Sequence, residues 1–278
     1  MADLSKTRDS PHREADQSRF TPSQIDLIKR EGEAIEEAVA WHAVGIVADD
    51  GQSIGTGTAI LWRQRALILT ARHVIESSPD DDIWFYFRHE GTLRRSPINE
   101  LSHQRGIKYK SKVRIEIVAR RSSENVDLAA LEVQKSTEHE QSVRFFQLTE
   151  DAATPLAGTI ITMRGYPSGQ AQAVGPSSAA AFAMLQWSRI QEKPRFEPFD
   201  PATEFLTPFV AANQGMHARG FSGAGVWFDK PTEGVWHPNL RLAGVCTAYY
   251  SRRKLLSVLR IEQVTQFLEE AFPACVST

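Results

Sequence analysis

The sequence lacks most of the features that mark secreted or membrane proteins. Its 278 residues include only two cysteines, Cys246 and Cys275, whereas small secreted proteins are usually rich in disulfides. No apolar run approaches the ~18 residues that a spanning helix needs. Residues 1–24 are polar and charged, without the apolar segment of a secretory signal. We therefore expect a cytoplasmic protein in which both thiols are free.

The sequence also lacks a strong charge bias. It has 32 Lys and Arg residues against 34 Asp and Glu residues, for a formal net charge of -2. Nucleic acids and anionic membranes attract clustered positive charge. The composition therefore predicts no nucleic-acid partner and no membrane partner. A hydrophobic fraction of 41% is typical of a soluble globular protein with a substantial core.

The sequence predicts a chain made mainly of β-strands, with a helix near each end. We expect a disordered tail over residues 1–20 and an N-terminal helix over 21–37, because Thr21-Pro22-Ser23 is a helix start followed by apolar residues at helical spacing. Short β-rich runs separated by turn signals then continue to Arg260 without βαβ alternation. This pattern predicts an all-β fold, followed by a C-terminal helix and tail over 261–278.

The β-rich region divides into two halves. We expect a first β-barrel over 38–145, a linker over 146–156 and a second β-barrel over 157–260. The linker segment contains Thr149-Glu150-Asp151 and Pro155, which favour a turn between the two halves. Residues 170–200 are rich in small residues and proline, and we predict a long loop there.

Three local patterns carry residues that could do chemistry. His73 directly follows an apolar strand (LILTARHVI), Asp127 opens another (VDLAALEV), and Ser222 lies in a glycine-rich turn (GFSGAG). A serine hydroxyl becomes a nucleophile when an imidazole removes its proton, and a carboxylate orients that imidazole. Glycines beside the serine permit a turn that aims backbone N–H groups at a developing oxyanion.

Each pattern has an ordinary explanation when taken alone. His73 could be a structural histidine, Asp127 could cap a strand end, and the serine could sit in any tight turn. The order His, Asp, Ser is nevertheless one of the orders in which catalytic triads occur. The joint occurrence of the three patterns therefore predicts a triad of His73, Asp127 and Ser222.

These segments resemble the trypsin-like (chymotrypsin-fold) serine peptidase superfamily, and within it the bacterial intracellular, HtrA-like type without a PDZ domain. The matching segments are GTGTAILW, LILTARHVI, VDLAALEV, MRGYPSG, GFSGAG and LAGVCTAYY, in the family's order over about residues 38–260. The resemblance implies an all-β fold of two antiparallel β-barrels with the active site between them. It also implies that His73 is the general base, Asp127 its orienting partner and Ser222 the nucleophile.

The resemblance further implies how a substrate would be held. The backbone N–H groups of Gly220 and Ser222 would form the oxyanion hole. The substrate pocket would be lined by Met216, Cys246, Thr247 and Ala248. The substrates would be proteins or peptides, and neither a metal nor another cofactor would be needed.

Two residues depart from the family's usual pattern. Phe221 stands before the serine, where many members have Asp or Asn. An Asp there pairs with a newly freed N-terminus in secreted zymogens, so we expect no activation by that route. Met216 stands where an Asp would select Lys or Arg. We therefore expect an apolar or small residue before the cleaved bond.

One alternative function stays open beside a serine endopeptidase that works through an acyl-enzyme intermediate. The chain could be a catalytically silent or latent trypsin-like domain that acts as a protein-binding or sensor module. A cytoplasmic peptidase also needs control, for which the candidates are the N-terminal helix, the 170–215 region and a regulatory protein partner. An α/β-hydrolase is disfavoured because Ala224 stands where its Gly-x-Ser-x-Gly elbow needs the second glycine.

Overall fold

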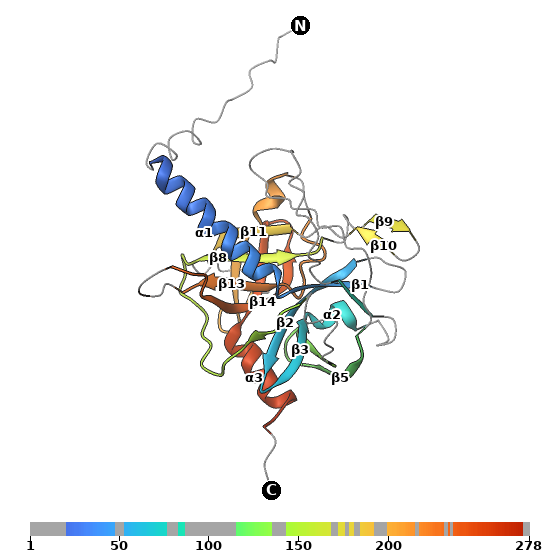
Figure 1. Cartoon of the computed structure of the whole chain (residues 1–278). Coiled ribbons are helices and arrows are strands. Elements are labelled where there is room, and N and C mark those ends of the chain that lie inside the picture. The colour runs from blue at the N-terminus through green and yellow to red at the C-terminus, as the bar shows by residue number, and fades with distance from the viewer. Residues whose placement is uncertain are drawn as a thin grey trace.

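The computed structural model of the chain describes residues 21–47, 53–76, 83–86, 115–134, 143–167, 172–175, 178–180, 184–191, 199–214, 217–230, 233 and 236–274. The disordered tail expected at residues 1–20 lies outside these ranges. The described residues form two large, mainly antiparallel sheets that lie side by side, with a helix against each end of the assembly (Figure 1). No helix in these ranges is long and apolar enough to cross a membrane.

The first sheet has seven strands in the order β4-β1-β2-β3-β6-β5, with β7 paired parallel to β2. Their bounds are β1 Ala43–Val47, β2 Ser53–Trp62, β3 Arg65–Thr70, β4 Trp84–Tyr86, β5 Ile117–Ser122, β6 Ala129–Val133 and β7 Phe146–Gln147. The short helix α2, Arg72–Ile75, follows β3 directly. Strand β7 is the last strand of the first sheet along the chain, and it lies at the start of the expected 146–156 linker.

The second sheet has six strands in the order β11-β8-β13-β14-β15-β12. Their bounds are β8 Ile160–Gly165, β11 Met184–Arg189, β12 Glu204–Pro208, β13 Gly225–Asp229, β14 Leu240–Tyr250 and β15 Leu255–Arg260. Between β8 and β11, strands β9 (Gln172–Gly175) and β10 (Ser178–Ala180) form a separate antiparallel pair. The 3-10 helix η4, Val210–Gln214, follows β12.

The segment predicted as a long loop, residues 170–200, contains strand β11. Met184–Arg189 pairs antiparallel with β8 along its whole length. Strands β9 and β10 lie in the same segment and pair with each other, so the prediction was wrong for all three strands. The segment MLQWSR does not show the alternation of apolar and polar residues that predicts a strand. Gln186 is polar but buried, and Trp187 is aromatic but partly exposed. The amide of Gln186 is satisfied inside the protein, since its Nε2 donates to the carbonyl of Pro208.

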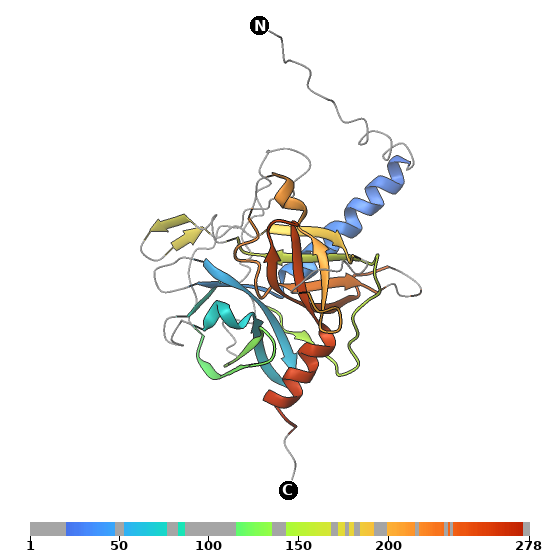
Figure 2. The ribbon, with the colours of Figure 1, turned by 180° about the vertical axis from the view of Figure 1, so that it is seen from behind.

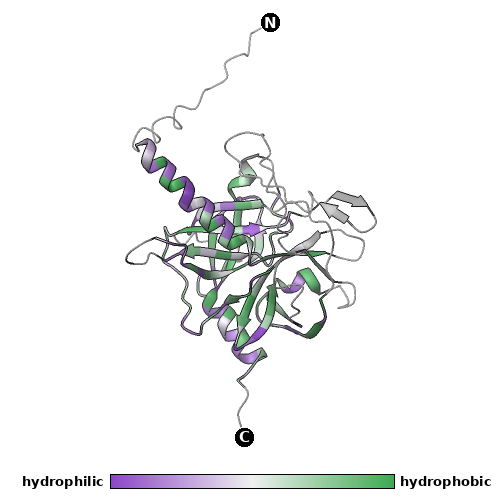
Figure 3. Ribbon diagram, in the orientation of Figure 1, coloured by the Kyte–Doolittle hydropathy of each residue, from purple (hydrophilic) through white to green (hydrophobic). Residues whose placement is uncertain are grey.

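Each sheet encloses its own apolar cluster, and a third cluster joins them. The cluster inside the first sheet includes Ile68 and Leu131, and the cluster inside the second includes Met163 and Val258. The third draws on both sheets and on the two long helices; it includes Ile60, Leu128, Trp227, Val245 and Leu268, among others. Apolar residues accordingly run along the strands of both sheets (Figure 3). Burial of this shared apolar surface stabilises the two sheets as one body.

The two long helices pack on the second sheet and on the shared cluster. Helix α1, Pro22–Ala40, begins at a capping box made by Thr21 and Gln24, with proline at its first position. It runs three residues beyond the expected bounds and crosses the second sheet near β8 (Figure 1). Helix α3, Ile261–Ala271, packs against β14 and β15 on another side, as the view from behind shows (Figure 2).

The fold class predicted from the sequence is confirmed. The structure is mostly β, with two mainly antiparallel sheets and few helices. The first sheet supplies the ends of β3 and β6, and the second supplies the turn before β13. These three chain segments carry the candidate site residues.

Candidate active site

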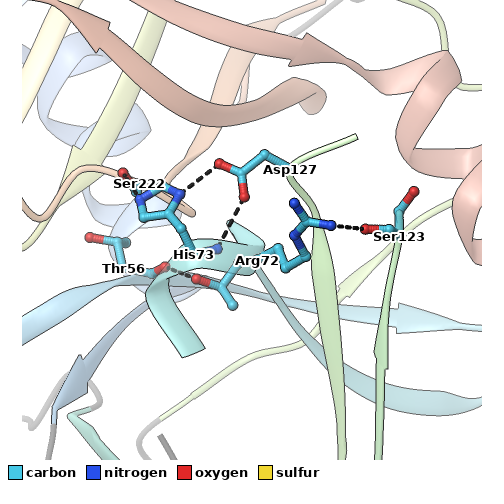
Figure 4. A network of polar contacts seen from close by, with 7 residues as sticks. Thr56, Arg72, His73, Ser123, Asp127 and Ser222 are labelled. Atoms are coloured by element: carbon cyan, nitrogen blue, oxygen red, sulfur yellow. Dashed lines mark hydrogen bonds and ion pairs between the residues drawn. The ribbon is translucent and has the colours of Figure 1, made fainter. Parts of the chain in front are cut away.

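His73 follows β3, a strand of the first sheet that is buried along most of its length. Strand β3 reads RALILT, and its last five residues are buried. The chain then turns at Ala71 into α2, where His73 is the second residue. The apolar strand fixes the start of α2, and the imidazole projects from it toward the second sheet (Figure 4). The side chain of His73 is half exposed.

Asp127 is held by a tight turn between β5 and β6. The hydroxyl of Ser123 accepts hydrogen bonds from the N–H groups of Asn125 and Val126, and Arg72 donates to the carbonyl of Ser123 at 3.0 Å (Figure 4). These bonds present the carboxylate to His73. One carboxylate oxygen lies 2.6 Å from Nδ1 of His73, and the other accepts its backbone N–H at 3.0 Å.

Ser222 completes the set from the second sheet. Its Oγ lies 3.0 Å from Nε2 of His73, so the two ring nitrogens contact the serine and the aspartate respectively (Figure 4). The turn around the serine needs its glycines, because Gly220 and Gly223 have φ values of 96° and 90°. A Cβ on Gly223 would also lie 1.8 Å from the carbonyl oxygen of Thr56.

The electrostatics of His73 and Asp127 favour an ion pair. The hydrogen bond that His73 donates to Asp127 raises the pKa of His73 above its ordinary value, although partial burial opposes the shift. Burial would raise the pKa of Asp127, but its hydrogen bonds with His73 and the charge of Arg72 outweigh burial and lower it. The carboxylate therefore stays ionised and stabilises the imidazolium form of His73.

Two backbone donors beside the serine are available to a ligand. Within the described ranges, no acceptor is hydrogen-bonded to the N–H of Gly220 or of Ser222. The neighbouring N–H groups are satisfied, since Phe221 donates to Ala218 and Gly223 donates to Cys246. A pair of free N–H groups next to a serine hydroxyl can bind an oxyanion.

The predicted pocket residues are placed only in part. Met216 lies outside the described residues. Cys246 is buried in the apolar cluster of the second sheet, and burial raises the pKa of its thiol to about 12. Thr247 is also buried, whereas Ala248 is partly exposed. Of the pocket residues that the structure describes, Ala248 is thus the one whose side chain reaches the surface.

Phe221 is anchored by apolar packing. Its ring is fully buried and makes an edge contact with Phe209 at a centroid distance of 5.4 Å. A Cβ on Gly165 would lie 2.6 Å from the ring, so a glycine there leaves the space that the ring occupies. An apolar anchor therefore stands where an Asp would make an ion pair.

The sequence patterns did not single out Gly165, Phe209 or Thr56. Gly165 belongs to β8 and Phe209 directly precedes η4, so neither lies in the GFSGAG pattern that contains Phe221. Thr56 contacts the serine turn through several hydrogen bonds. The segment GTGTAILW contained it, but only as part of a β-rich run.

Among the described residues, no group of three His, Cys, Asp or Glu side chains could hold a metal ion.

Comparisons with known proteins agree with this fold. A family model described as a trypsin-like peptidase domain matches residues 57–230, more than half of the chain. No curated protein matches the sequence. The structure is similar to the MamO protease domain from Magnetospirillum magneticum, with a TM-score of 0.51 and 13% identity over 82% of this chain and 96% of that one.

Two further solved structures share the fold at low identity. One is the scabies mite inactivated protease paralogue SMIPP-S-I1, with a TM-score of 0.54 and 15% identity over 84% of this chain and 95% of that one. The other is human heparin binding protein, with a TM-score of 0.52 and 15% identity over 83% of this chain and 91% of that one. At these identities the similarity establishes the fold alone.

Proposed function

The chain belongs to the trypsin-like peptidase domain family, and we propose that it is a serine endopeptidase that cleaves protein substrates through His73, Asp127 and Ser222. One observation carries the proposal. A continuous set of hydrogen bonds joins the Asp127 carboxylate to Nδ1 of His73 at 2.6 Å and Nε2 of His73 to Oγ of Ser222 at 3.0 Å. Both distances are within the reach that proton transfer needs.

The proposed reaction is an acyl transfer in two stages. His73 takes the proton of the Ser222 hydroxyl as Oγ attacks the carbonyl carbon of the scissile peptide bond. The imidazolium then gives that proton to the leaving amine, and the acyl group stays on Ser222. His73 takes a proton from water as the water attacks the acyl carbon, and then gives that proton to Oγ of Ser222 as the acid leaves. Asp127 stays ionised throughout, because its low pKa keeps it a carboxylate.

The proposed oxyanion hole consists of the backbone N–H groups of Gly220 and Ser222. Their freedom from other acceptors among the described residues supports this assignment. Charge that develops on the carbonyl oxygen during attack would be stabilised by both N–H groups. We place the substrate pocket at Met216, Cys246, Thr247 and Ala248, and expect an apolar or small residue before the cleaved bond.

The domain arrangement and cellular setting are further parts of the proposal. We take the first unit as 38–145, the linker as 146–156 and the second unit as 157–260, with residues 1–20 as a disordered tail. The shortage of cysteine favours a cytoplasmic location, where a regulatory protein partner could limit cleavage. No metal or other cofactor takes part in the proposed steps.

A second candidate is a catalytically silent or latent domain that binds proteins. One observation favours it: the scabies mite protein of the same fold is described as an inactivated protease paralogue. The fold alone therefore does not guarantee activity. In the present chain the three side chains are hydrogen-bonded in series, and the turn glycines take the positive φ values that the turn needs, which favours the peptidase.

A peptide-library digestion separates the two candidates. The purified full-length chain and its Ser222→Ala variant are each incubated with a mixture of peptides derived from a cell extract, and new termini are identified by mass spectrometry. The peptidase predicts new termini with the wild-type chain and none with the variant. Identical termini, or none from either folded protein, would refute the endopeptidase. Retention of the same protein partner by both proteins would then favour the binding module.

A further inference from the structure

We infer that Thr56 is a positioning residue of the proposed peptidase, whose hydroxyl and backbone hold the turn of Ser222 in its working shape. The inference rests on the proposed function and deepens it. Thr56 lies on β2 of the first sheet, whereas the serine turn belongs to the second. Its side chain is fully buried. Among the described residues, the hydroxyl of Thr56 is hydrogen-bonded to Gly220 and Tyr166 and not to His73.

The hydroxyl of Thr56 makes two buried hydrogen bonds. Its Oγ1 donates to the carbonyl oxygen of Gly220 at 2.5 Å and accepts the N–H of Tyr166 at 2.9 Å. The hydroxyl thus uses its one donor on a carbonyl and at least one acceptor position on an N–H group. A buried hydroxyl with both partners has a defined direction, and it fixes the direction of the carbonyl that it contacts.

The backbone of Thr56 makes two more hydrogen bonds. Its N–H donates to the carbonyl of Ser222 at 2.9 Å, and its carbonyl accepts the hydroxyl of Thr70 at 2.8 Å. Thr56 therefore binds the two carbonyls that lie on either side of Phe221, one in each direction along the chain. The neighbouring Thr58 adds a hydrogen bond from its hydroxyl to the carbonyl of Gly223.

These contacts fix the two peptide groups on either side of the Phe221–Ser222 peptide. The peptide group after Gly220 is held at both ends, by Thr56 at its carbonyl and by the bond from the Phe221 N–H to Ala218. The peptide group after Ser222 is likewise held by Thr56 and by the bond from the Gly223 N–H to Cys246. The N–H of Ser222 lies between two fixed planes, and so its direction is set without a ligand.

A substitution of Thr56 by Val isolates the hydroxyl. Valine keeps the shape of the side chain, but it leaves the carbonyl of Gly220 and the N–H of Tyr166 without that partner in a buried place. Substitution by Ser keeps the hydroxyl. Thr162 on β8 offers a matched control, since it is also buried on a strand and its Oγ1 has no hydrogen-bond partner among the described residues.

The first measurement is the rate at which a fluorophosphonate probe labels the folded protein, for wild type, Thr56→Val, Thr56→Ser and Thr162→Val. We expect Thr56→Val to label roughly ten- to a hundredfold more slowly, and the other two variants to label within about threefold of wild type. The midpoint of the rate-against-pH curve should be the same in all four, because the His73–Asp127 pair is untouched. Equal rates for Thr56→Val and Thr162→Val, or a Thr56→Ser variant as slow as Thr56→Val, would overturn the inference.

The second measurement needs no activity. Hydrogen–deuterium exchange of peptides covering residues 217–226 should be faster in Thr56→Val than in Thr162→Val and wild type. Unchanged exchange in that segment would overturn the inference, whatever the labelling shows. Failure of the wild-type chain to label would instead refute the proposed function, and the exchange result would then decide on the role of Thr56 alone.

Discussion

Asp127 gives His73 both its orientation and its charge preference. One carboxylate oxygen binds Nδ1 and the other binds the backbone N–H of the same residue, so the ring cannot turn without breaking a charge-assisted bond. The bond to Asp127 also raises the pKa of His73 above the ordinary histidine value of about 6.5. A general base must be neutral to accept a proton. The protein therefore gains basic strength at His73 but loses the neutral form at a higher pH than an ordinary histidine would.

This balance predicts the pH dependence of the reaction. The rate of fluorophosphonate labelling should fall as the pH drops, with a midpoint above 6.5, because the raised pKa protonates His73 early. In Asp127→Asn the midpoint should move to lower pH, since the main cause of the shift is removed, and the maximal rate should fall roughly a thousandfold or more. Rate–pH curves of the two proteins test this. A shared midpoint would contradict the role given to Asp127.

We expect Gly165 on β8 to tolerate no larger side chain, because it lies against the buried ring of Phe221. Gly165→Ala would place a Cβ 2.6 Å from the ring, so the ring or the strand must shift. We expect a loss of about 1–3 kcal/mol in the free energy of unfolding and slower labelling of Ser222. Gly32→Ala in α1 is the matched control, because its added Cβ has no atom within 4 Å. Urea denaturation measures both variants, and equal stabilities would refute the packing argument.

The two halves of helix α1 differ in how far they are buried against the rest of the protein. Its buried residues all lie in the second half: Ile35, Glu36, Val39 and Ala40. Trp187 of β11 donates to Glu36 at 3.4 Å, which ties that half to the second sheet. In the first half, Leu27 and Ile28 are 55% and 52% exposed. The second half therefore stabilises the body, while the first half adds little to it.

The two halves of α1 predict losses of different size when an isoleucine is replaced by alanine. Ile35→Ala removes a buried side chain from the cluster shared by the two sheets, and should cost about 2 kcal/mol or more in the free energy of unfolding. Ile28→Ala removes a half-exposed side chain and should cost less than about 0.5 kcal/mol. Urea denaturation of both variants checks this. Equal losses would mean that the first half of α1 also packs on the body.

The elements differ in how far the sequence could predict them. The start of α1 was predictable because its capping box and proline are local signals. The strands near His73 and Asp127 were predictable because their apolar runs are continuous. Strand β11 was not, because Gln186 and Trp187 break its alternation and find their partners, Pro208 and Glu36, far away in the sequence.

On the scale of the whole molecule, the candidate site is a product of both sheets. His73 and Asp127 come from the first sheet and Ser222 from the second, so their contacts depend on how the two sheets pack. The shared apolar cluster sets that packing, and buried hydrogen bonds from Thr56 and Thr58 to the serine turn fix it locally. The order of the three motifs predicted which residues would meet. It could not predict the role of Thr56, because the partners of its hydroxyl, Gly220 and Tyr166, lie more than a hundred residues away.

The most direct test of the central claim is the location of a fluorophosphonate label on the purified full-length chain. The probe reacts with a serine whose hydroxyl is activated by a base, so we expect a single label on Ser222, found by mass spectrometry. The label should be absent from Ser222→Ala and from His73→Ala, and present in a Ser257→Ala control. A folded wild-type protein that stays unlabelled, or a label that persists after loss of His73, would contradict the assignment of these residues as a catalytic triad.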